Sequence, residues 1–176
     1  MVYIACIALL FALTVWVGLR NTPIILRNSL SVHVGKSKHS IAVARICFPA
    51  ISMLLLAWFL THYTLNNPMR VDIVLGMTLF TMTIAIQGFL PYGQRHKWDR
   101  VHDIAAWAAA CIGPVLLLRF AWVSYGPTQL LMLVCGLLSV AILSALLLVP
   151  SVRKYFLILQ LSMVMISGAS FIILSL

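Results

Sequence analysis

Six long apolar runs separated by short polar gaps organise this chain. The runs cover Val2–Leu19, Ile41–Thr64, Val71–Leu90, Val101–Tyr125, Thr128–Val149 and Tyr155–Leu176. An α-helix rises about 1.5 Å per residue, so about 20 apolar residues cross a hydrocarbon layer of about 30 Å. The runs lack the alternation that is typical of membrane β-strands. The pattern therefore predicts an all-α, polytopic transmembrane bundle of six helices, forming one domain over residues 1–176.

The positive charges predict how the bundle is oriented. Lys and Arg residues collect around the first, third and fifth gaps, at Arg20, Arg27, Lys36, Lys38, Arg45, Arg95, Lys97, Arg100, Arg153 and Lys154. The other two gaps hold only Arg70 and Arg119. Because cytoplasmic loops carry an excess of Lys and Arg, we expect the odd gaps in the cytoplasm and both termini on the non-cytoplasmic side. We expect a bacterial inner (plasma) membrane, with the first run retained as a helix because it lacks a signal-peptide pattern.

The composition excludes several other classes of protein. With 63% hydrophobic residues and only three acidic ones, the chain cannot build the charged shell of a soluble domain. Its net charge of +9 lies in gaps between spanning runs, so nucleic acid is not an expected partner. The four cysteines lie inside runs and form no CxxC pair, which indicates apolar packing residues and no disulfide framework or zinc site.

The first gap is the longest and leaves two alternatives. An unstructured basic loop would be sufficient to set the topology. Alternatively, Pro23–Val32 forms a short helix on the inner membrane interface, with Lys36 and Lys38 near anionic headgroups. We expect the unstructured loop, since positive charge at this side needs no further role.

A polar turn, Pro91–Asp103, concentrates charge between the third and fourth runs. If a helix starts near Asp99, then Asp99, His102 and Asp103 share one face at i, i+3 and i+4. A structural role is the first alternative, because Asp at a helix start caps N–H groups and pairs with nearby Arg. A proton relay or substrate contact is the second, and a divalent metal site is the third.

Polar residues of other runs are expected at the same depth. Arg45 lies one turn inside the second run, Gln87 near the end of the third and Gln160 near the inner end of the last. We therefore predict a cytoplasm-facing polar pocket lined by Arg45, Gln87, His96, Asp99, His102, Asp103 and Gln160. His62 and His102 lie almost a membrane thickness apart, so we expect no haem. We predict no catalytic residue, metal or cofactor, since no catalytic motif is present.

The fourth run carries a ladder of small residues. Ala105, Ala109 and Gly113 recur every four residues, a spacing that lets helix backbones approach closely in lipid. We expect these residues to mediate helix packing and the fourth helix to be the most contacted one. The same face is a candidate docking surface for a membrane protein partner or a second copy of the chain.

Two stretches resemble a known family. The first stretch consists of Phe89-Leu-Pro91, a short polar loop and then His102-Asp-Ile-Ala-Ala. The second stretch is Arg153-Lys-Tyr-Phe-Leu-Ile-Leu-Gln160. They resemble a bacterial six-helix membrane family of unknown function that is distantly similar to the damage-regulated autophagy modulator superfamily. Members often carry an acidic residue directly after the Phe-Pro turn, where this chain has Tyr92-Gly93. The resemblance implies a lipid-facing role, because eukaryotic relatives are connected with membrane lipid organisation and glycolipid-anchor remodelling.

Three functions follow as hypotheses. We favour binding or handling of a lipid or other amphiphile at the polar pocket, with Arg45 and the basic gaps holding an anionic headgroup. A small proton-coupled transporter, with His102 and Asp103 carrying the proton, is the second. A structural subunit of a larger membrane complex is the third.

Overall fold

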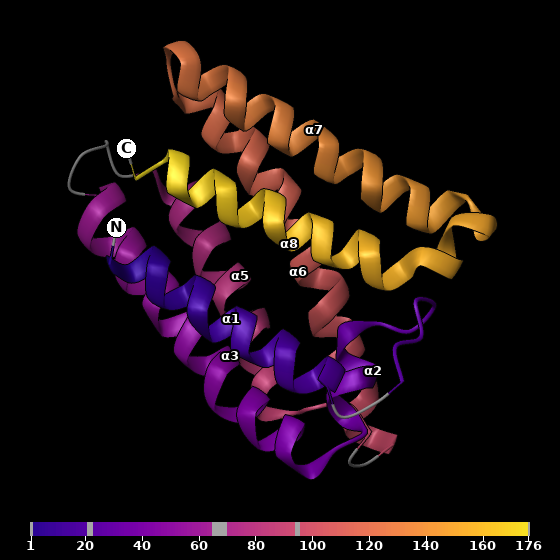
Figure 1. Cartoon of the computed structure of the whole chain (residues 1–176). Coiled ribbons are helices and arrows are strands. Elements are labelled where there is room, and N and C mark those ends of the chain that lie inside the picture. Colours follow the sequence, from indigo (N-terminus) through magenta and orange to yellow (C-terminus); the bar gives the residue numbers. More distant parts are fainter. Residues whose placement is uncertain (1, 21–22, 65–69, 94–95, 176) are drawn as a thin grey trace.

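The fold is a bundle of helices joined by short connections (Figure 1). The structure is a computed structural model that describes residues 2–20, 23–64, 70–93 and 96–175, without the side chains of residues 96 and 97. The spanning helices are α1 (Val2–Arg20), α3 (Lys38–Trp58), α5 (Val71–Phe89), α6 (His96–Val123), α7 (Gly126–Leu148) and α8 (Phe156–Ile173). The described residues also form three short helical elements, namely α2 (Leu30–Gly35), the π-helical turn η1 (Phe59–Tyr63) and the 3₁₀ turn η2 (Pro150–Tyr155).

The six predicted spans are confirmed, and no strand occurs in the described part of the chain. The largest change is at α6, which begins at His96, before the apolar run that starts at Val101. Many large apolar side chains face outward, with Leu9, Met53 and Trp122 each more than 70% exposed. Water would penalise such a surface, whereas lipid accepts it. The chain is an integral, multi-pass membrane protein.

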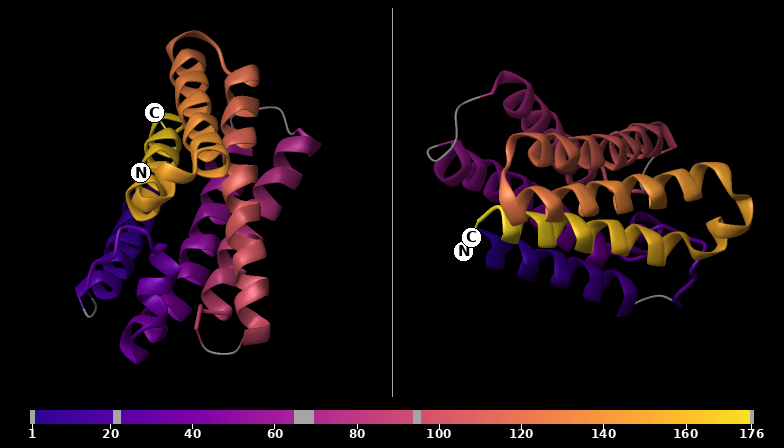
Figure 2. Two further views of the ribbon diagram at one scale, coloured as in Figure 1. Left: turned by 90° about the vertical axis from the view of Figure 1, so that its right-hand side faces the viewer. Right: turned by 90° about the horizontal axis from the view of Figure 1, so that it is seen from above.

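Helices that follow one another in the sequence pack side by side. The α3 helix packs against α1 and α5, and α6 packs against α5 and α7. The α8 helix packs on α7 and returns beside α1, so the two chain ends emerge at the same end of the bundle (Figures 1 and 2). The expectation that α6 alone is the central helix needs correction, because α3 holds an equivalent position between two neighbours.

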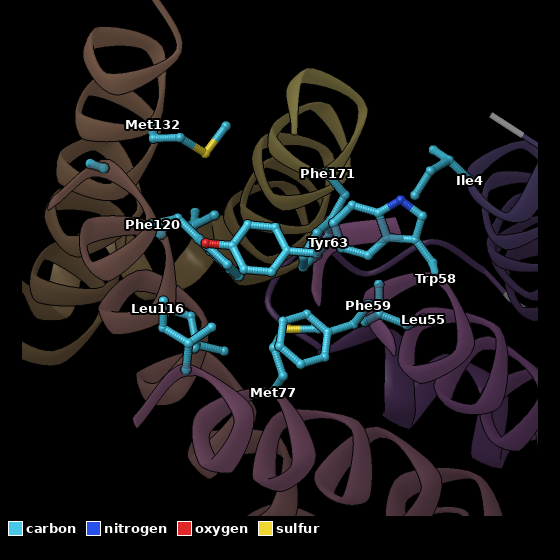
Figure 3. Close-up of a cluster of buried hydrophobic side chains, with 13 residues drawn as sticks. Ile4, Leu55, Trp58, Phe59, Tyr63, Met77, Leu116, Phe120, Met132 and Phe171 are labelled. Carbon is cyan, nitrogen blue, oxygen red and sulfur yellow. The ribbon is translucent and has the colours of Figure 1, made fainter. Parts of the chain in front are cut away.

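Most of the large aromatic side chains of the core gather near the chain ends. There Trp58, Phe59 and Tyr63 of the second span pack with Phe120 of α6 and Phe171 of α8 (Figure 3). The Tyr63 and Phe120 rings meet edge to face with centroids 5.0 Å apart. A second, smaller cluster at the other end joins α2, α3 and α8 through Leu30, Val34, Ala44 and Leu157. The two clusters fix opposite ends of the bundle.

Glycines allow the closest helix approaches. A Cβ on Gly88 would lie 2.5 Å from Pro49 Cδ and 2.8 Å from Phe48 Cβ, so α5 and α3 touch at this position. In the predicted ladder of α6, Ala105 is buried, Ala109 is partly buried and Gly113 contacts the Phe80 ring of α5. The ladder residues therefore lie on a face that is at least partly covered by the chain itself.

Candidate functional site

The segment between α1 and α3 is folded against the bundle. Ser29 caps α2, since its Oγ accepts a hydrogen bond from Val32 N at 3.3 Å. Leu30, His33 and Val34 are buried. The prediction of an unstructured loop is therefore wrong. The alternative of an interfacial helix over Pro23–Val32 is also wrong in its position, because the helix starts at Leu30 and packs on protein.

His33 holds this segment together from within. Its ring is fully buried, and its Nδ1 lies 2.9 Å from the carbonyl oxygen of Ser29. The backbone N–H of Ile25 donates to His33 Nε2 at 3.0 Å. A carbonyl can only accept, so Nδ1 carries the hydrogen and Nε2 the lone pair. The role of His33 is not among the predictions from the sequence, although a histidine four residues after a capping Ser indicates it.

Three neighbours hold the folded segment in place. The backbone N–H of Leu157, at the start of α8, donates to the Leu26 carbonyl at 2.9 Å. Gln160 of α8 accepts a hydrogen bond from Leu30 N at 2.9 Å. Gly35, at the end of α2, lies so close to the polar turn that a Cβ there would overlap the carbonyl oxygen of Tyr92. The segment therefore bridges α8 and the polar turn.

The polar turn is closed by two side chains of α6. Asp99 accepts a hydrogen bond from Gly93 N at 2.7 Å, and Gly93 adopts the positive φ of +85° that the reversal requires. His102 Nδ1 donates to the carbonyl oxygen of Leu90 at 2.8 Å, which caps the end of α5. Tyr92 meets the His102 ring edge to face, with centroids 5.9 Å apart. These contacts support the structural alternative for Asp99.

His102 also carries a polar atom that is not satisfied. Its side chain is 2% exposed, and among the described residues its Nε2 has no hydrogen-bond partner. Because Nδ1 carries the hydrogen, Nε2 of the neutral ring is an acceptor. Leaving a buried polar atom unpaired costs about 1–3 kcal/mol. At the polar turn, Nε2 of His102 is therefore an acceptor that no described residue bonds.

The other predicted pocket residues are not drawn together around His102. Asp103 and Arg45 are exposed. Gln87 donates to the Thr83 carbonyl of its own helix at 3.2 Å, and Gln160 is bonded to α2. The side chain of His96 lies outside the described part of the chain. The structure thus brings Asp99 and His102 together at the polar turn. The side-chain amides of Gln87 and Gln160 instead bond to the backbone of α5 and α2.

A metal site would need more ligands than the polar turn brings together. In the described part of the chain, no group of three His, Cys, Asp or Glu side chains is close enough to hold an ion. Asp72, the third acid, lies at the opposite end of the bundle in an ion pair with Arg119. The sequence does not predict this pair, because the two residues lie in different runs and only the fold brings them together.

Comparison of the chain with protein-family models, with curated proteins and with solved structures found no match. The site must therefore be interpreted from its own chemistry.

Proposed function

We propose that the protein binds an amphiphile at the end of the bundle formed by α2 and the polar turn, with a headgroup atom hydrogen-bonded to His102. One observation carries the proposal, namely the buried Nε2 of His102 that no described residue satisfies. An acceptor atom is satisfied by a donor, so the headgroup atom is a hydroxyl or an ammonium group. Filling this position removes the penalty of an unpaired buried atom.

The surroundings of His102 suit an amphiphile. Val101, Ile104 and Trp107 of α6, the helix that carries His102, present exposed apolar side chains at the outside of the bundle, where acyl chains can lie. Lys36, at the end of α2, and Arg100 are exposed near the polar turn and can hold a phosphate. A phospholipid whose headgroup carries both a phosphate and a hydrogen-bond donor matches this combination.

Native mass spectrometry of the detergent-extracted protein tests the proposal. We expect wild-type protein to retain one phospholipid, and His102→Phe to reduce that population by roughly tenfold, since loss of a buried hydrogen bond costs about 1–3 kcal/mol. His39→Phe is the matched control, because His39 is exposed on α3 near the same end of the bundle. Retention should be unchanged in this variant.

Two outcomes would contradict the proposal. The first is wild-type protein that carries no phospholipid. The second is equal retention in wild type and His102→Phe. Equal thermal stability of the two variants would show that a loss of lipid does not reflect unfolding.

A further inference from the structure

The segment 23–36 packs on the polar turn that carries the candidate site. Gly35 at its end contacts the Tyr92 carbonyl, and Gly93 in turn approaches the Gly35 carbonyl, with a built Cβ 3.4 Å from that oxygen. Tyr92 packs against the His102 ring. Tyr92 thus links the segment to the buried His102 ring, and a headgroup that is to reach Nε2 needs this packing to open first.

One internal ring, that of His33, fixes the turn of the segment that precedes α2. His33 bonds Ser29 through Nδ1 and Ile25 through Nε2, so one buried side chain joins both ends of the turn that precedes α2. Only the neutral ring with hydrogen on Nδ1 can make both bonds. Protonation would place an N–H of the ring against the N–H of Ile25.

A positive charge on His33 would find little compensation. The described charged and titratable groups of the segment and of the elements packed on it at this end of the bundle are mostly basic, namely Arg20, Arg27, Lys36, Lys38, His39, Arg45, Tyr92, Asp99, Arg100, His102, Asp103, Arg153, Lys154 and Tyr155. Of the two acids among them, Asp99 already accepts a hydrogen bond from Gly93 and Asp103 is exposed. A buried charge without a partner is strongly unfavourable.

We propose that the segment 23–36 is a pH-sensitive lid over the His102 site, which neutral His33 holds closed and protonated His33 releases. Opening breaks the bonds of the segment to α8, at Leu157 and Gln160, and separates Gly35 from Tyr92. The inference rests on the proposed function only for the ligand that the lid admits. The movement of the lid is a property of the chain alone.

Hydrogen exchange of the full chain, without added lipid, tests the lid. We expect acidification from about pH 7.5 to about pH 5.5, where histidine changes charge, to speed exchange in residues 23–36. After correction for intrinsic rates, the increase should be roughly tenfold, because protonation of the ring removes the hydrogen bond that Ile25 donates to it. Exchange in α3 and α5 should stay constant.

Two variants make the test specific. His33→Gln removes the titrating ring, and the exchange of residues 23–36 should then be the same at both pH values. His39→Gln, at an exposed position, should respond as wild type does. A wild-type segment that does not respond to pH overturns the lid, and so does a full response in His33→Gln. Lipid retention by native mass spectrometry is measured separately, so failure of the lid and failure of the binding proposal are distinguishable.

Discussion

Single polar side chains in this bundle are used mainly within their own helices. The hydroxyls of Thr14, Thr78 and Ser170 each donate to the carbonyl four residues earlier. Such bonds satisfy a hydroxyl locally where lipid offers no partner. Two buried side-chain atoms of the described residues lack such a partner, namely Ser139 Oγ within α7 and His102 Nε2 at the polar turn.

Gly88 is the residue at which α3 and α5 depend most directly on the absence of a side chain. Gly88→Ala would place a Cβ against Pro49 and Phe48, so the helices must separate. We expect a loss of stability of about 1–3 kcal/mol, measured by thermal unfolding in detergent.

Gly168→Ala is the matched control for this prediction. Gly168 lies within α8, and a Cβ there would meet no atom within 4 Å. Ala is a better helix former than Gly by about 1 kcal/mol, so this variant should be as stable as wild type or more stable. Equal destabilisation by both substitutions would contradict the packing derived for Gly88.

At the scale of elements, run length was sufficient to predict the spans. The hydrophobic runs located all six spanning helices because an apolar stretch of this length has few alternatives in lipid. The apolar run predicts a start at Val101, whereas α6 begins at His96, because the mostly polar stretch His96–Arg100 is also helical. Polarity marks where the hydrocarbon ends, and a helix can continue past that depth.

The folded segment 23–36 was not predictable in the same way. It has no long apolar run, and α2 spans only Leu30–Gly35. Its fold depends on Leu157 and Gln160, which lie far away in the sequence. For the same reason the sequence places Asp99, His102 and Asp103 on one side of a helix but does not predict that His102 alone is buried. Contacts with the end of α5 bury His102, while Asp103 stays exposed.

At the scale of the molecule, the two alternative functions stay predictions. A proton relay would use His102 and Asp103, which differ in exposure and are not bonded to each other in the described structure. A structural subunit would use the ladder on α6, of which Ala105 is buried and Gly113 contacts Phe80. Neither Asp103 nor the ladder on α6 provides a buried polar atom without a hydrogen-bond partner, as His102 Nε2 does.

The orientation of the bundle also stays a prediction, and it can be measured. Lys36 directly follows α2 and Tyr125 directly precedes α7, at opposite ends of the bundle (Figure 1), and both residues are exposed. Lys36→Cys should react with a membrane-impermeant maleimide only from the cytoplasmic side, because basic loops stay in the cytoplasm. Tyr125→Cys is the control and should react only from the other side. The reverse pattern would show that the termini are cytoplasmic.

The central claim, that a headgroup donor bonds His102 Nε2, is tested most directly by NMR of protein with ¹⁵N-labelled histidine. The resonances of His102 are identified as those that are missing in His102→Phe. We predict that a phospholipid with an ethanolamine or glycerol headgroup shifts the Nε2 resonance, because the lone pair accepts a hydrogen bond. A choline headgroup, which has no N–H or O–H donor, should leave it unchanged. An Nε2 resonance that shifts with none of these lipids, or equally with all of them, would contradict the account.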